Sequence, residues 1–243
     1  MKIALIADLH GNRPATEALA KDLQTQGADA LWCLGDVVGK GPSNDFTCDW
    51  AFANCDLLLA GNWDLGVGGK CYAADAYYWA QIGEERMRRL RALPKEHSFW
   101  MSGRHIRLFH GRPVMDELLT PQADSAVLDP FFTDASGASY DVVIYADLHR
   151  QGIRTLTQRV FVNIGSVGNA LGVNDCCYAL LEGEPGEKRA PFEIRLRQLD
   201  YDRERAAADA QSADGLRHAD AYAREILTGK YSRGNLPPEV LNK

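Results

Sequence analysis

The sequence lacks an excess of basic residues: 27 lysines and arginines face 33 aspartates and glutamates, for a net charge of −6. This balance excludes a general electrostatic attraction to nucleic acid or to an anionic membrane, so a phosphate-bearing ligand would need a local site. We therefore expect no nucleic-acid partner.

Cysteine pairs and long apolar runs are missing as well. None of the six cysteines stands in a C-x-x-C arrangement, and together they do not form a dense framework. The apolar run at residues 3–7 is broken by Asp8 and His10 and is far shorter than a signal sequence or a membrane span. These absences predict a cytoplasmic protein with reduced thiols and no membrane association.

The order of the expected elements indicates an α/β fold. Apolar residues make up 46% of the chain and charged residues 25%, as in globular proteins. Strands are expected at 2–7, 30–34 and 56–60, with a capped helix between Asn12 and Gly27 and another at 44–54. This βαβαβ start predicts a layered α/β sheet.

The rest of the chain is expected to be rich in strands. A helix over 73–93 carries Glu84 and Glu85 ahead of Arg88 and Arg89, which offers i,i+4 support. Further strands are predicted at 98–102, 105–109, 141–146, 153–158, 160–164, 176–181 and 192–199. We expect one domain over 1–243, with 201–243 as a helical C-terminal extension and Pro237 and Pro238 in a loose tail.

Short polar clusters follow successive strands of this prediction. DLH stands at 8–10, GD at 35–36, GNWD at 61–64, HG at 110–111 and ADLH at 146–149. Because ligands of α/β sheets bind beyond the carboxyl ends of strands, these clusters are expected to converge on one crevice. Their carboxylate, imidazole and carboxamide groups form a mixed nitrogen and oxygen set that suits Mn, Fe, Ni or Zn.

These motifs resemble the pattern of the calcineurin-like metallophosphoesterase family, which reads D-x-H, G-D, G-N-H-[DE], H and G-H-x-H. The longer forms DLHGN, GDVVGKGP and NIGSVGN look like the bacterial and archaeal branch of predicted phosphodiesterases. The resemblance covers about residues 1–200 and implies a layered β-sandwich flanked by helices. It also implies a metal-dependent phosphoesterase, most simply a phosphodiesterase, that works by attack of a metal-bridging hydroxide. Its expected substrate is a small phosphoester or nucleotide.

By this resemblance, two divalent ions share a set of family ligands, with Asp36 bridging them. The matching positions are Asp8, His10, Asp36, Asn62, His110 and His149. Mn is the expected ion, with Fe, Ni, Zn or Mg as alternatives. Asp36, Asn62 and Asp64 are the candidate catalytic residues. Asp64 is expected to orient a metal ligand without contacting an ion itself.

Two positions depart from the family pattern. Asp147 replaces the first histidine of G-H-x-H, and Trp63 replaces the histidine of G-N-H-[DE]. We expect Asp147 to act as a seventh ligand. Its added negative charge would favour Mn or Mg and monoanionic diesters. Trp63 either packs or stacks on a nucleobase, because an indole cannot replace a histidine as a proton donor of tuned pKa.

Other roles are left open by the sequence. Arg112 and Asn12 join Trp63 as candidate substrate-binding residues, and a surface role for Arg112 is an equal alternative. The helices after Tyr201 form either a solvated face or the surface of a homo-oligomer. The altered positions Trp63 and Asp147 also allow a metal-retaining nucleotide-binding or regulatory module with little turnover as an alternative function.

Overall fold

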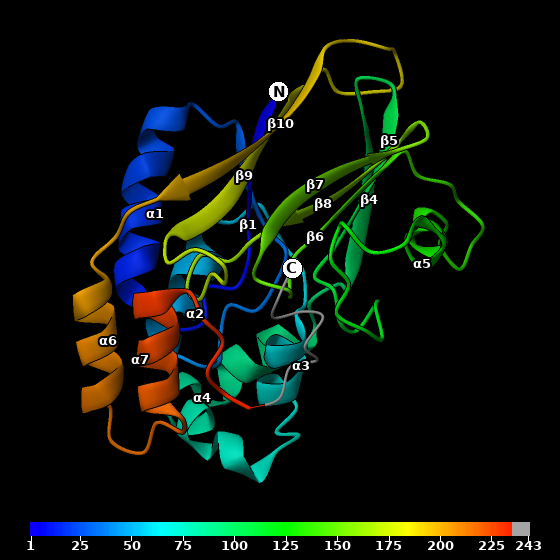
Figure 1. Ribbon diagram of the computed structural model, residues 1–243. Helices are drawn as coiled ribbons and strands as arrows, with labels where there is room; N and C mark the ends of the chain where they lie inside the picture. Colours follow the sequence, from blue (N-terminus) through cyan, green and yellow to red (C-terminus); the bar gives the residue numbers. More distant parts are fainter. Residues whose placement is uncertain (235–243) are drawn as a thin grey trace.

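The computed structural model describes residues 1–234, which form two sheets and the helices that cover them (Figure 1). The strands are β1 (Lys2–Ile6), β2 (Ala30–Cys33), β3 (Leu57–Leu58), β4 (Glu96–Met101), β5 (Arg104–Phe109), β6 (Val142–Tyr145), β7 (Gln151–Leu156), β8 (Arg159–Ile164), β9 (Cys176–Gly183) and β10 (Phe192–Leu199). The helices are α1 (Arg13–Gln26), α2 (Asn44–Asn54), α3 (Asn62–Gly68), α4 (Ala76–Arg91), α5 (Ser125–Leu128), α6 (Arg203–Ser212) and α7 (Ala219–Thr228), with short 3-10 turns at η1 (Ala73–Asp75) and η2 (Asp129–Phe132).

Both sheets are mixed, with parallel strands at their centres. The first has the order β10-β9-β1-β2-β3. In it β1, β2 and β3 are parallel, β9 is antiparallel to β1, and β10 is antiparallel to β9. The second has the order β4-β5-β6-β8-β7, in which β5, β6 and β8 are parallel. The expected α/β fold, a layered sandwich flanked by helices, is confirmed.

Alternation along the strands divides the core into layers. Ile3 and Leu5 of β1 share a buried cluster with Ile106 and Val142 of the second sheet, so these side chains fill the space between the sheets. Ala4 and Ile6 point the other way, into a cluster with the helices. This period of two explains why β1 is apolar throughout: helices or strands cover both of its faces.

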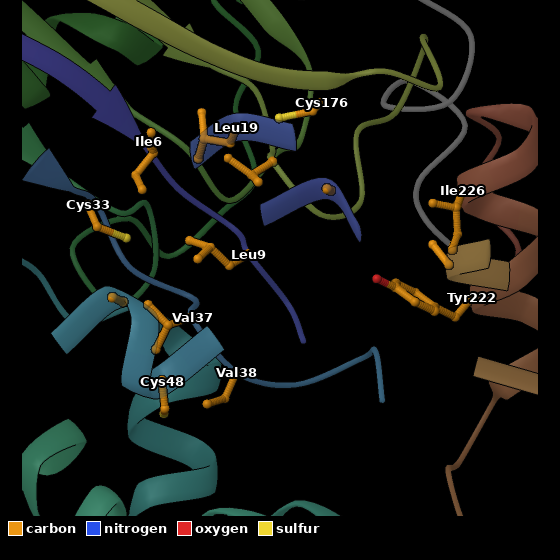
Figure 2. Packing of buried hydrophobic residues seen from close by; sticks show 14 of the residues in the cluster. Ile6, Leu9, Leu19, Cys33, Val37, Val38, Cys48, Cys176, Tyr222 and Ile226 are labelled. Carbon is orange, nitrogen blue, oxygen red and sulfur yellow. The ribbon is translucent and has the colours of Figure 1, made fainter. Parts of the chain in front are cut away.

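The C-terminal helices belong to the helix-side core. Tyr222 and Ile226 of α7 lie in the same buried cluster as Leu9, Leu19 and Val38 (Figure 2). In Figure 1, α6 and α7 lie next to each other on the side of the first sheet that also carries α1. The expectation of one domain over 1–243 with a helical extension at 201–243 stays a prediction. Its part at residues 235–243, with Pro237 and Pro238, lies outside the described residues.

Helix ends follow the local signals that the sequence carries. Asn12 caps α1 by accepting a hydrogen bond from the Ala15 amide, and Gly27 ends the helix in the left-handed region at φ 60°. Helix α2 begins and ends as predicted. The chain after Tyr201 is helical, as expected, but it divides into α6 and α7.

Several expectations about elements were wrong in detail. The strand expected at 56–60 is reduced to two residues, and α3 was not predicted because its seven residues include two glycines. Gly83, at φ 71°, interrupts the helix expected over 73–93. The expected i,i+4 pairs are absent there: Glu85 binds Arg88 at i,i+3, and Glu84 binds Arg91. Among the described helices, none has the length and apolar character needed to cross a membrane.

Candidate metal centre

The polar clusters after the strands meet at one end of the two sheets. Asp8 and His10 follow β1, Asp36 follows β2, and Asn62 opens α3 just after β3. From the second sheet, His110 follows β5, while Asp147 and His149 follow β6. Except for the partly covered Asn62, these residues are buried, with exposures of 6% or less. The convergence expected from the strand ends is therefore present in the structure.

A left-handed backbone turns these side chains inward. Asp8, His10, Asp36, Asp147 and His149 have φ angles between 47° and 62°. Non-glycine residues rarely adopt this conformation, although Asp and His tolerate it better than most. The two Asp-Leu-His segments thus share one local geometry, with a buried leucine between two left-handed residues. Such strain is concentrated at functional sites.

One group of ligand atoms gathers around Asp8. Its Oδ1 atom lies 3.3 Å from His149 Nε2 and 3.5 Å from His10 Nε2. The two imidazole Nε2 atoms are 3.2 Å apart. Three donor atoms so close together, all buried, can hold one metal ion.

A second group adjoins the first. His110 Nε2 lies 3.2 Å from Asp36 Oδ2 and 3.7 Å from Asp8 Oδ1. Asp36 Oδ2 is also 3.7 Å from His10 Nε2, so it stands between the two histidines. Asp8 belongs to both candidate groups, and Asp36 belongs to the second.

The donor atoms of this cluster lack partners among the described residues. Both oxygens of Asp8, Oδ2 of Asp36, Oδ1 of Asn62 and Nε2 of His110 are buried without a hydrogen bond. Buried polar atoms are normally satisfied, and an unpaired buried carboxylate is especially costly. Divalent cations would satisfy all of these atoms together, so the residues present fit the metals that the sequence implies.

The three imidazoles are held with their Nε2 atoms toward the cluster. Nδ1 of His10 lies 3.0 Å from the Val38 carbonyl, and Nδ1 of His110 lies 2.9 Å from the Leu34 carbonyl. Nδ1 of His149 is 2.6 Å from the Asn169 carbonyl. Because a carbonyl oxygen only accepts, Nδ1 must donate, and Nε2 of each ring is directed at the cluster; Nε2 of His149 also lies 2.9 Å from Lys40 Nζ. Metal-binding histidines in proteins are typically oriented in this way.

The charge of the cluster attracts cations. Burial opposes protonation of His110, yet Asp36 and Asp8 raise the pKa of its imidazole to about 10. Burial and the nearby Lys40 have the opposite effect on His10, whose pKa falls to about 3. The two carboxylates therefore create a position that favours positive charge, which a divalent ion could occupy in place of the proton.

Asp64 anchors the loop that carries Asp36. Its carboxylate accepts hydrogen bonds from the amides of Asp36 at 2.7 Å, Val37 at 3.0 Å and Gly61 at 3.0 Å. Burial, and after it the negative charge of Asp36, raise the pKa of Asp64 to about 7. The Trp63 amide in turn donates to Asp36 Oδ1 at 2.8 Å, so Oδ2 remains directed at the histidines.

The loops of Asp36 and Asn62 are in close contact. A Cβ atom at Gly61 would lie 2.0 Å from Asp36 Oδ1. The glycine of the G-N-W-D motif is therefore required by the approach of the Asp36 side chain to the backbone. This contact brings the third strand end against the second.

Asp147 is held by Arg112. The guanidinium donates from Nε to Oδ2 at 2.8 Å and from Nη2 to Oδ1 at 2.6 Å, and the Arg112 amide also donates to Oδ2. Burial would raise the pKa of Asp147, but Arg112 lowers it below its usual range. Oδ1 of Asp147 is 3.9 Å from His110 Nε2, at the edge of the cluster. Arg112, which was expected to bind substrate, therefore binds Asp147, which was expected to be a seventh metal ligand.

The Trp63 ring is wedged beside the histidines. A Cβ at Gly39 would lie 2.2 Å from Cε3 of the indole, so the Gly39 backbone lies directly against the ring. The ring meets His10 and Tyr78 edge to face, with centroids 5.9 Å apart in each case. The side chain nevertheless lines the cavity described below. Trp63 therefore packs on one side and borders open space on another.

Asn12 is not brought to the cluster's open side. Its Oδ1 atom caps α1, and its Nδ2 atom donates to the Gly168 carbonyl at 2.9 Å and to the Tyr201 hydroxyl at 3.4 Å. It is 2% exposed and does not line the cavity. The structure therefore gives Asn12 a structural role, in place of the substrate contact expected from the sequence.

A cavity of about 870 Å³ opens from the cluster. Asn62, Asp147 and His149 line its metal side, with Trp63 and Tyr72 among the aromatic residues of its wall. This volume lies in the range of cavities that hold whole nucleotides or similar small molecules. The candidate metal centre is thus reached from a space large enough for substituents on both sides of a phosphate.

Sequence reasoning overlooked residues that border the site. Lys40 places its Nζ atom 2.9 Å from His149 Nε2 and 3.3 Å from Asn169 Oδ1. Lys40 belongs to the extended motif GDVVGKGP and Asn169 to NIGSVGN. Neither residue was assigned a role from the sequence. Arg233 and Tyr231 line the cavity as well, and no motif pointed to them.

Comparison with known proteins agrees with this fold. A protein of Methanocaldococcus jannaschii described as uncharacterised is 25% identical, over 84% of this chain and 89% of its own. A crystal structure of a metallophosphoesterase from Sphaerobacter thermophilus has a TM-score of 0.73 at 21% identity, covering 94% of this chain and all of that one. A structure described as a novel archaeal phosphodiesterase has a TM-score of 0.51 at 19% identity, over 82% of this chain and all of that one.

The family model of the calcineurin-like phosphoesterase superfamily domain matches residues 1–185. These residues contain every strand end that contributes to the cluster. The family implies divalent metal ions, and the described residues provide buried histidine and aspartate groups that could hold them. The chain belongs to the calcineurin-like phosphoesterase superfamily.

Proposed function

We propose that this protein is a phosphodiesterase that depends on two divalent metal ions. The observation that carries the proposal is the set of buried donor atoms without partners on Asp8, Asp36, Asn62 and His110. A pure binding module has little need of such a set, because an unsatisfied buried carboxylate is costly when no cation is bound. Family membership supplies the reaction class, the hydrolysis of a phosphoester.

In this proposal, one ion is held by Asp8, His10, Asp36 and His149, and the other by Asp36, Asn62 and His110. When bound, the ions would polarise the phosphoryl oxygens and activate a water molecule. The mixed nitrogen and oxygen set favours Mn, with Fe, Ni, Zn or Mg as alternatives.

The residues of the chain fix the geometry for this reaction. Asp64 and the Trp63 amide hold Asp36 in a single orientation through three hydrogen bonds to the Asp36 loop and side chain, at 2.7–3.0 Å. Backbone carbonyls do the same for the three histidines. Because these contacts exist in the protein itself, little reorganisation would be needed when substrate binds.

Diesters are favoured by the shape of the site more than by its charge. The negative charge of Asp147, which was expected to disfavour monoester dianions, is balanced by Arg112 at 2.6 Å. The cavity of about 870 Å³ instead provides room for a substituent on each side of the phosphate. The shared fold of the archaeal structure described as a phosphodiesterase makes the same substrate class the first to test.

The test is hydrolysis by the protein reconstituted with Mn. Bis(4-nitrophenyl) phosphate serves as the diester and 4-nitrophenyl phosphate as the monoester, and elemental analysis measures the bound metal. Asp36→Asn should abolish turnover while leaving the fold intact, because the amide can still accept the hydrogen bond from Trp63. The exposed Asp214→Asn is the matched control and should behave like the parent. Metal binding without hydrolysis of either ester would favour the regulatory alternative.

A further inference from the structure

The cavity beside the metal centre is completed by a part of the chain that follows α7. Arg233 and Tyr231 line it together with Lys40 and His149. These two C-terminal residues lie beyond residues 1–185, which match the family model.

Arg233 contacts neighbouring side chains, but not all of its hydrogen-bond donors have a partner among the described residues. Its side chain is 10% exposed, its Nε atom lies 3.1 Å from Oε2 of the buried Glu225, and its guanidinium lies 5.1 Å from the centre of the Tyr222 ring. Nη2 is buried and has no hydrogen-bond partner among the described residues. A guanidinium has five donors, and leaving one of them buried and unpaired carries a cost.

A second cation, Lys40, lies at the end of the same polar network. Its Nζ donates to Asn169 Oδ1, and Asn169 Nδ2 donates to Glu225 Oε2 at 3.2 Å, which also pairs with Arg233. Lys40 and Arg233 thus lie along one chain of contacts that contains a single buried carboxylate, Glu225, so two positive charges face one negative charge there.

We propose that Lys40 and Arg233 form a subsite for a second phosphate group of the substrate, next to the phosphate that is hydrolysed. An anion there would satisfy Nη2 of Arg233 and balance the excess positive charge of the two cations. The substrates would then be pyrophosphate-containing esters or diesters that carry a further phosphate. The hydrolytic meaning of this subsite rests on the proposed phosphodiesterase function, but its binding of phosphate does not.

The subsite can be tested on the full chain without metal. Calorimetric titration of the chelator-treated protein should show tighter binding of inorganic pyrophosphate than of inorganic phosphate. Arg233→Gln should weaken pyrophosphate binding about tenfold or more, as expected when a charged hydrogen-bond donor is lost. Arg224→Gln, an exposed change on α7, should leave it unchanged. Pyrophosphate affinity equal to that of the parent in Arg233→Gln would overturn the proposal.

Further variants separate binding from folding. Arg233→Lys retains the charge and should keep much of the affinity, and Lys40→Gln should weaken pyrophosphate binding without touching the Glu225 pair. If Arg233→Gln fails to fold, Lys40→Gln decides: unchanged affinity overturns the proposal. Glu225→Gln breaks the ion pair but leaves both cations, so it should lower the melting temperature without weakening pyrophosphate binding. If Glu225→Gln weakens pyrophosphate binding as much as Arg233→Gln does, the role of Arg233 is purely structural and the proposal is overturned.

The Mn-loaded enzyme gives the kinetic counterpart. ADP-ribose carries a pyrophosphate and bis(4-nitrophenyl) phosphate a single phosphate, so Arg233→Gln should raise KM for ADP-ribose selectively. If the parent hydrolyses the simple diester but its binding of pyrophosphate does not depend on Arg233, the proposed function stands and the subsite is overturned. If the protein hydrolyses neither ester but binds pyrophosphate through Arg233, the subsite stands and the proposed function is overturned.

Discussion

Arg112 and Asp147 form a bidentate ion pair at the edge of the candidate metal centre, with both carboxylate oxygens engaged by the guanidinium. The Asp147 side chain is 3% exposed, whereas that of Arg112 is 42% exposed. The pair therefore fixes a buried negative charge with a cation that reaches it from solvent. It keeps the net charge of the site close to that of a centre without the extra aspartate.

We expect Arg112→Gln to destabilise the protein by about 1–2 kcal/mol, because it leaves the Asp147 carboxylate buried without its cation. The partial exposure of Arg112 keeps this value below that of a fully buried pair. Urea unfolding of the metal-free protein measures the change. The double variant Arg112→Gln with Asp147→Asn should recover part of the loss, since no unpaired charge remains. Equal losses in the single and double variants would contradict this account.

Asp147 also remains our prediction for a seventh metal ligand. Each carboxylate oxygen has two lone pairs, so Oδ1 can serve Arg112 and an ion together. Asp147→His should then raise the affinity for the second ion and the relative activity on monoesters, because a neutral ligand replaces an anionic one. Metal titration and the ratio of diester to monoester turnover measure the two effects. A histidine variant that changes neither quantity would mean that Asp147 only anchors Arg112.

Trp63→His should have opposite effects on stability and turnover. The smaller ring leaves space against Gly39 and Tyr78, so we expect a loss of about 2 kcal/mol in unfolding free energy. Turnover of the folded protein should rise, by roughly 10²-fold where proton transfer limits the rate, because an imidazole can protonate a leaving group. Trp63→Phe is the control that opens space without adding a donor. If both variants reduce turnover equally, Trp63 is needed as it stands.

Removal of metal should lower the stability of the fold. Ligands that bind only the folded state stabilise it by mass action, by about 2.7 kcal/mol at a concentration 100 times the Kd. We therefore expect the melting temperature to fall on chelation and to recover when Mn is added back. Asp36→Asn should show a much smaller recovery, since the shared ligand is lost. A parent protein whose melting temperature is indifferent to both chelator and Mn would contradict a buried metal centre.

The elements that the sequence predicted well are those with local signals. Asn12 and Gly27 mark the two ends of α1 within a short stretch of chain, and the alternation along β1 reflects its two buried faces. Helix α3 was missed because its glycines hide a helix that begins at the candidate ligand Asn62. Its amino end depends on contacts of Asp64 and the Trp63 amide with the loop of Asp36, a tertiary effect.

The convergence of the cluster could be predicted because strand ends carry it, whereas the partnerships around it could not. The contact of Lys40 with His149 joins residues 109 positions apart, and the pair of Arg112 with Asp147 joins residues 35 apart. No spacing rule links such positions. Arg233 reaches the cavity only because α7 packs on the helix-side core, so its place required the three-dimensional structure.

The left-handed backbone at Asp8, His10, Asp36, Asp147 and His149 sets stability and function against each other. Each such residue carries a conformational cost of about 1 kcal/mol, which glycine would avoid. Glycine at Asp147 would avoid this backbone cost but would also remove the carboxylate that accepts three hydrogen bonds from Arg112. Stabilising substitutions in this protein should be sought away from the ends of β1, β2 and β6. At those strand ends, a substitution that relieves the backbone also removes a candidate functional side chain.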